Sequence, residues 1–126
     1  MAKKNYRLES DLLGEVKVPQ EALYGGQTQR ALENFPLQGE RSIGHYPTLI
    51  EALLQIKWAA ALTNQKTNFL EPNISKAIIM GAQHLIKQPF THNFPVHHLH
   101  GGGGTSANMN ANEILANYAE ESLGGK

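Results

Sequence analysis

The sequence predicts a mainly α-helical domain that begins with a short extended or β arm. Two observations indicate this fold class. Two long segments carry apolar residues at helical spacing and a third reads as a helix that follows a glycine turn, whereas a loose alternation of apolar and polar residues is confined to the start of the chain. The chain has 126 residues, of which 40% are hydrophobic, so it has about the size of one domain and can bury one core. We therefore expect a single domain over residues 1–126.

The short elements are expected in the first part of the chain. Residues 1–19 form the arm, either as two short strands or as an extended segment. Residues 20–35 form short helices. The first is a helical turn over 20–24 that two glycines end, and the second covers 27–34 and ends before a proline.

Long helices are expected over residues 47–68, 73–87 and 106–122. The first begins at a proline, which is tolerated at that position because its missing N–H would be unpaired anyway. Its apolar residues form two stripes: Leu49, Leu53, Ile56 and Ala60 on one side, and Ile50, Leu54 and Ala61 on the other. Because most of the circumference is apolar, we expect this helix to be central. The second helix has a one-sided amphipathic pattern.

The third long helix is unusual because it carries four asparagines on two faces. The amide side chains compete for backbone hydrogen bonds, so such a helix would be marginal in isolation. Asn108 shares one face with Thr105 and Asn112, whereas Asn110 and Asn117 lie on the opposite face. We expect the helix to be buried among polar partners, which are not evident within the 126 residues.

Composition excludes several classes of function. Eleven Lys and Arg residues balance eleven Asp and Glu residues, so the chain would not hold a polyanion by counterion release, and we expect neither nucleic acid nor a membrane as a partner. The sequence has no cysteine, which excludes disulfides and thiolate metal sites. No apolar run follows the first residues, so we expect no signal peptide or spanning segment and a soluble, cytoplasmic protein.

The residues of the segment 101–113 are of types that suit a binding site better than a packed core. Four glycines at 101–104 permit positive φ angles and a close approach of backbone to a ligand. Thr105 and Ser106 follow, and we expect them to cap a helix whose N-terminus is suited to an anion such as a small carboxylate. A flexible linker is the alternative. A Walker phosphate loop is excluded, because it needs a lysine between the last glycine and the hydroxyl residue, whereas here Thr105 directly follows Gly104.

Other candidate residues have a simpler explanation. Four histidines, His92, His97, His98 and His100, match no metal-site template, so we favour a surface or interface role and expect no metal. Glu113 could be a general acid or base, but a solvated or structurally paired carboxylate is favoured. Trp58 is expected in the core or an interface.

Three ordered blocks of sequence resemble the N-terminal domain of the aspartase/class II fumarase superfamily. They are ESDLLGEVKVP at 9–19, ALYGGQTQRALENF at 22–35, and GTSANMNANE at 104–113 followed by Ala-Asn at 116–117. The likeness covers essentially the whole chain and is weakest at 36–46 and 87–98. It implies a helical N-terminal domain with an extended arm, which precedes the long helical bundle of a homotetramer. That bundle is absent from these residues, and the chain ends without a closing element, so we expect it to be the front part of a longer protein.

The resemblance also implies a reaction and a binding role. Members of the family catalyse the reversible anti elimination of ammonia from aspartate or of water from malate, giving fumarate, without a cofactor. The extra charge of the aci-carboxylate intermediate is held by hydrogen-bond donors. In the family the equivalent of Thr105 contacts a carboxylate of the dicarboxylate substrate, beside a glycine turn, here Gly103 and Gly104. Ser106 and Asn108 complete the substrate-binding residues that the resemblance implies.

The catalytic base of the family is a serine in a Gly-Ser-Ser loop, which this sequence lacks. We therefore expect no catalytic residue in this chain and no turnover by the chain in isolation. At the turn, Gly101 and Ser106 match the aspartase form, and Gly103 lacks the serine hydroxyl of fumarases, so the sequence favours an aspartate ammonia-lyase. His100 departs from the glutamine of both forms. A fumarate hydratase, another lyase of the superfamily and a non-catalytic helical interaction module remain the alternatives.

Overall fold

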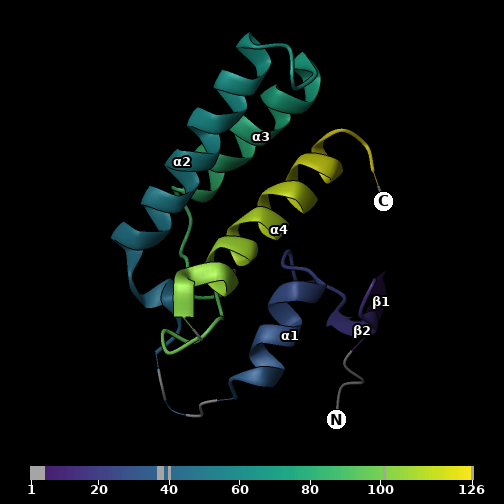
Figure 1. The fold of residues 1–126 in the computed structure, drawn as a ribbon, viewed down its shortest axis with the longest axis vertical. Helices are drawn as coiled ribbons and strands as arrows, with labels where there is room; N and C mark the ends of the chain where they lie inside the picture. The colour runs from purple at the N-terminus through teal and green to yellow at the C-terminus, as the bar shows by residue number, and fades with distance from the viewer. Residues whose placement is uncertain (1–4, 37–38, 40, 101, 126) are drawn as a thin grey trace.

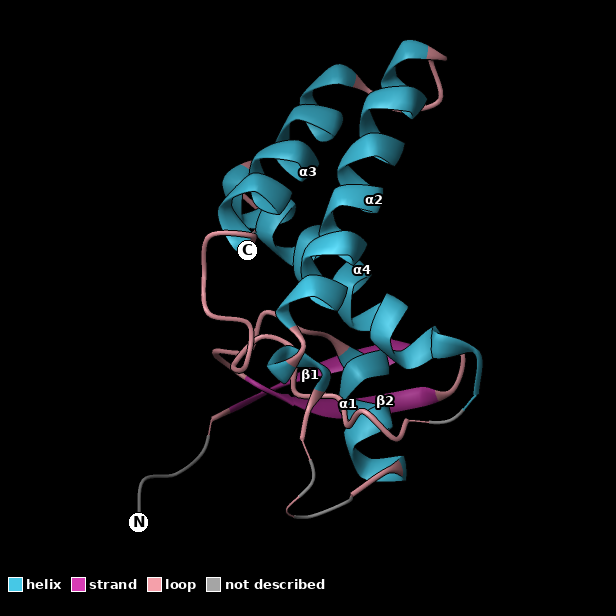
Figure 2. Cartoon of the chain, turned by 90° about the vertical axis from the view of Figure 1, so that its left-hand side faces the viewer, coloured by secondary structure: helices cyan, strands magenta, loops and turns pink. Residues whose placement is uncertain are grey.

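A computed structural model describes residues 5–36, 39, 41–100 and 102–125 of the chain. These residues form a small antiparallel sheet and four α-helices, of which three are long and pack together at one end of the molecule (Figure 1). In both views, helix α1 and the sheet lie toward the lower end of the molecule (Figures 1 and 2), and α1 contacts α4. The mainly helical fold class with a β arm is confirmed.

The arm is a β-hairpin. Strand β1 (Tyr6–Asp11) pairs antiparallel with β2 (Gly14–Pro19), in a register that sets Tyr6 opposite Pro19 and Asp11 opposite Gly14. Gly14 has a φ of 106°, which a glycine adopts without strain and which allows the tight turn between the strands. Val16 and Val18 are buried on the face that packs against α1. The alternation in the sequence thus corresponds to one covered face and one open face.

The helix expected over 20–24 is absent, and this expectation is wrong. The first helix, α1 (Gly26–Asn34), begins only after this segment, which runs as turns and bends. The guanidinium of Arg7 donates to the carbonyl oxygens of Pro19, Ala22 and Tyr24 at 2.7–2.9 Å. A distant side chain therefore takes the hydrogen bonds of these carbonyls, which a local helix would otherwise have used.

The three long helices are close to their expected positions. Helices α2 (Pro47–Lys66) and α3 (Pro72–Leu85) form a helical hairpin, and α4 (Thr105–Ser122) packs along α3 and also contacts α1 and α2 (Figure 1). Two short 3₁₀ turns, η1 (Ile43–His45) and η2 (Gly102–Gly104), precede α2 and α4. No helix within the described ranges is both long and apolar enough to cross a membrane.

The core lies where α2, α3 and α4 meet the loop before the glycine turn. Its largest fully buried side chains include Phe94, Ile43, Ile50, Leu54 and Ile114. The expectation that α2 is central is wrong, since only the stripe of Ile50, Leu54 and Ala61 is buried. Its other apolar stripe faces outward, with Leu49 45% and Ile56 60% exposed. Two apolar stripes allow α2 to be packed on two sides, but the described residues pack against only one of them.

Candidate functional site

The glycine turn adopts the backbone conformation that makes glycine necessary there. Gly103 and Gly104 have φ angles of 79° and 72°, in the left-handed region that other residues enter only at a cost. A side chain at either position would meet nothing within 4 Å, so the space in front of the turn is open. Conformation therefore favours glycine at these two positions, and packing does not. Gly101 lies outside the described residues.

The expected capping of α4 by Thr105 and Ser106 is wrong. Helix α4 begins at Thr105 itself, the residue before it is Gly104, and no side chain of the described residues caps this helix end. A serine or threonine cap has an extended backbone, whereas the position before this helix is left-handed, which only glycine adopts freely. The first N–H groups of α4 therefore have no side-chain cap, at the end of the helix that attracts negative charge.

The residues expected to bind substrate lie within the glycine turn and the first turn of α4. Gly103, Gly104 and Thr105 are exposed, and Ser106 and Asn108 are half-buried. Asn108 lies one turn after Thr105 on the same face of α4, while Ser106 points about 100° away.

Lys57 of α2 contacts the face of α4 that carries Thr105 and Asn108, and this contact was not predicted from the sequence. Its Nζ atom donates to Oδ1 of Asn108 at 2.5 Å. The sequence did contain a signal, because Lys57 is a charged residue in the middle of a long helix whose other residues are mostly apolar. A charge at such a position indicates a polar partner, but the sequence does not show which helix provides it.

The other face of α4 holds the surrounding loops. Nδ2 of Asn110, which is fully buried, donates to the backbone oxygen of Asn93 at 3.0 Å, and Nδ2 of Asn117 donates to that of Leu23 at 2.6 Å. The polar partners of Asn110 and Asn117 are thus backbone carbonyls of the chain itself, which the sequence pattern could not reveal. The asparagines opposite the site therefore have a structural role.

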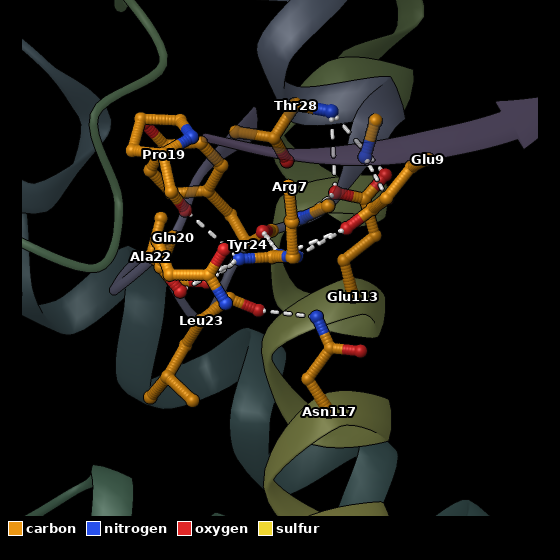
Figure 3. Close-up of polar contacts among 12 residues, drawn as sticks. Arg7, Glu9, Pro19, Gln20, Ala22, Leu23, Tyr24, Thr28, Glu113 and Asn117 are labelled. Carbon is orange, nitrogen blue, oxygen red and sulfur yellow. Dashed lines mark hydrogen bonds and ion pairs between the residues drawn. The ribbon is translucent and has the colours of Figure 1, made fainter. Parts of the chain in front are cut away.

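Glu113 is a structurally paired carboxylate, as the favoured interpretation of the sequence expected. Its carboxylate, reaching from α4, accepts from the backbone N–H of Gly25 at 2.5 Å, of Gln27 at 2.8 Å and of Thr28 at 3.2 Å (Figure 3). Glu9 of β1 accepts from Gly26 N at 2.6 Å. Two carboxylates from distant elements therefore cap α1, whose own N-cap residue is a glycine without a side chain.

The histidines near the turn do not converge. Nδ1 of His98 donates to the carbonyl oxygen of Arg41 at 2.6 Å, because a carbonyl oxygen can only accept a hydrogen bond. The Nδ1 atoms of His97 and His100 are buried and have no hydrogen-bond partner among the residues that the structure describes, and burial lowers the pKa of His100. His92 is exposed. Across the part of the chain that the structure describes, no three potential ligands of the His, Cys, Asp or Glu type are grouped to hold a metal ion.

Comparison with known proteins places this helical fold and glycine turn in a class of lyases. The family model described as "Lyase" matches residues 14–125. The chain belongs to this family, the aspartase/class II fumarase superfamily, and corresponds to its N-terminal domain.

Particular relatives include both kinds of enzyme. The chain is 43% identical to an aspartate ammonia-lyase of Corynebacterium glutamicum, over 96% of this chain and 23% of the relative. It is 46% identical to a class II fumarate hydratase of Nitrosomonas europaea, over 95% of this chain and 25% of the relative. The crystal structure of a fumarate lyase:delta crystallin from Brucella melitensis superposes with a TM-score of 0.90 at 42% identity, covering 96% of this chain and 28% of that one. The chain thus spans about a quarter of the length of its curated relatives.

Proposed function

We propose that this chain supplies the substrate-carboxylate-binding turn of an ammonia-lyase that interconverts L-aspartate with fumarate and ammonia. The observation that carries the proposal is the left-handed pair Gly103 and Gly104, which leads into a helix start without a side-chain cap. In this proposal one carboxylate of the four-carbon acid accepts hydrogen bonds from the Thr105 hydroxyl and from the first backbone N–H groups of α4, with Ser106 and Asn108 beside it.

The chemical step needs groups beyond this turn. The preorganised donors can hold negative charge, but proton abstraction from the substrate requires a base, and no residue of this chain is assigned that role. We propose that the complete site forms in a homotetramer, in the cytoplasm, where other segments and subunits supply the base. The isolated chain should not form fumarate from aspartate, and fumarate detected by its ultraviolet absorbance with the purified chain would contradict this.

A fumarate hydratase is the second candidate, because class II fumarate hydratases are as similar to this chain as aspartate ammonia-lyases are. Gly103 favours the ammonia-lyase, since it offers no hydroxyl to the substrate. Both candidates share the carboxylate site.

Binding to the chain tests the shared part of the proposal. In a nuclear magnetic resonance titration of the ¹⁵N-labelled chain with fumarate, the backbone signals of residues 103–106 and the side-chain amide of Asn108 should shift together along one saturating curve. Acetate, with one carboxylate, is the matched probe for a simple anion site. Shifts that saturate elsewhere on the molecule, with none at the turn, would refute the carboxylate site.

A further inference from the structure

Lys57 carries a positive charge that the described residues do not neutralise. It lies half-buried on α2, and the ion pairs of the described chain join Arg7 with Glu9 and Arg30 with Asp11, so neither involves Lys57. Its hydrogen-bond partner is a neutral amide oxygen, that of Asn108. A half-buried ammonium without a carboxylate favours an anion nearby, because a charge removed from water needs compensation.

This contact fixes the orientation of the Asn108 amide. An ammonium group has only donors, so the oxygen of the amide must face Lys57, and the assignment of oxygen and nitrogen is unambiguous here. The NH₂ group then points away from Lys57, and it makes no hydrogen bond to any residue that the structure describes. Asn108 thus presents two donors on the face of α4 that also carries Thr105.

Solutes can reach this region. A groove of about 270 Å³ runs between α2, α3 and α4, and its lining includes Lys57 and Asn112 together with the apolar side chains of Ala61 and Leu115. Asn112 is the next residue of the site face, one turn after Asn108. The groove therefore opens beside the Lys57–Asn108 contact.

We propose that Lys57 is a positioning residue of the carboxylate site: by donating to Asn108 Oδ1 it turns the two amide donors of Asn108 toward the bound acid. The ammonium also adds a positive charge that favours a dicarboxylate over a neutral solute. This inference rests on the proposed carboxylate site and assigns a role to a residue of α2, a helix outside the glycine turn.

Two substitutions separate positioning from a structural role. Lys57→Met removes the donor and the charge but keeps the length of the side chain. Asn108→Asp keeps the acceptor for Lys57, as an ion pair, but removes both amide donors. Lys66→Met, at the exposed end of the same helix, is the control for loss of one charge.

The fumarate dissociation constant of each variant is measured by the same titration, and thermal unfolding is followed in parallel. Lys57→Met and Asn108→Asp should each weaken binding about tenfold or more, the equivalent of one hydrogen bond to a charged group. Lys66→Met should match the wild type. Asn108→Asp should lose binding with an unchanged or raised melting temperature, which a purely structural contact would not produce.

The outcomes distinguish this inference from the proposed function. If the wild type binds fumarate at the turn and Asn108→Asp or Lys57→Met binds equally well, Lys57 does not position the site, while the carboxylate site stands. If Lys66→Met weakens binding as much as Lys57→Met, the effect is one of general charge and the positioning role is wrong. If the wild type shows no shifts at the turn, the carboxylate site itself is refuted, and this inference with it.

Discussion

Removal of the Glu113 carboxylate should destabilise the chain through the start of α1 rather than through the site. Substitution of Glu113 by alanine leaves the N–H groups of Gly25, Gln27 and Thr28 without their acceptor. Loss of an ordinary N-cap side chain costs about 0.5–2 kcal/mol. The cost is raised here because one charged group accepts from three donors. It is limited because Glu113 is only half-buried, so water can replace part of the lost hydrogen bonding. We therefore expect Glu113→Ala to lower the free energy of unfolding by about 2 kcal/mol.

For a domain of this size, 1 kcal/mol corresponds to roughly 4 °C in melting temperature, so Glu113→Ala should lower it by about 8 °C. Glu113→Gln, which retains one neutral acceptor, should lie between the wild type and the alanine variant. Glu121→Ala is the matched control, since Glu121 is exposed near the end of the same helix. Circular dichroism during heating measures all three. Equal melting temperatures for Glu113→Ala and Glu121→Ala would refute the assignment of Glu113 as the cap of α1.

Two further predictions concern packing and pH. Gly26→Ala places a Cβ atom 2.8 Å from Cγ1 of Val16, so it should destabilise the chain by about 1–3 kcal/mol in urea unfolding. Gly39→Ala meets no atom of the described residues within 4 Å, so it tests the strain of a positive φ alone. Burial lowers the pKa of His100 in the folded chain, so as the pH falls this histidine is protonated in the unfolded chain before it is protonated in the folded one. The free energy of unfolding should therefore decrease below about pH 6.5, and His100→Gln should reduce this pH dependence. A pH profile of stability that is the same for both proteins would exclude His100 as a contributor.

The helices could be predicted from the sequence because their signals are local. Apolar spacing placed α3 within two residues of its observed ends, and Pro47 marked the start of α2. Gly25 and Gly26 similarly indicated where a new helix could begin, and α1 begins at Gly26. Each of these features depends on a few neighbouring residues, which the sequence displays directly.

The errors arose where distant residues decide the local structure. The carbonyls at 19–24 are bound by Arg7, and the start of α1 is capped by Glu113, more than 80 residues later in the chain. The start of α4 differs from the expectation for a local reason instead: Thr105 and Ser106 are good cap residues, but the left-handed Gly104 occupies the position before the helix. Long-range partners of this kind leave no periodic pattern in the sequence.

The candidate site was predictable in part. The positive φ of the turn follows from consecutive glycines, and the shared face of Thr105 and Asn108 follows from helical geometry. Lys57 could not be placed there, because its contact depends on how α2 packs against α4. The fold therefore adds to the predicted turn a charged residue from a second helix.

The most direct test of the account is the affinity of the chain for fumarate when only the Thr105 hydroxyl is changed. Thr105→Val keeps the shape of the side chain and removes the hydroxyl, whereas Thr105→Ser keeps the hydroxyl. If the turn binds a carboxylate as proposed, the valine variant should bind fumarate about tenfold more weakly, and the serine variant should remain close to the wild type. Equal dissociation constants for the valine variant and the wild type would contradict the central claim that Thr105 is a donor to the substrate carboxylate.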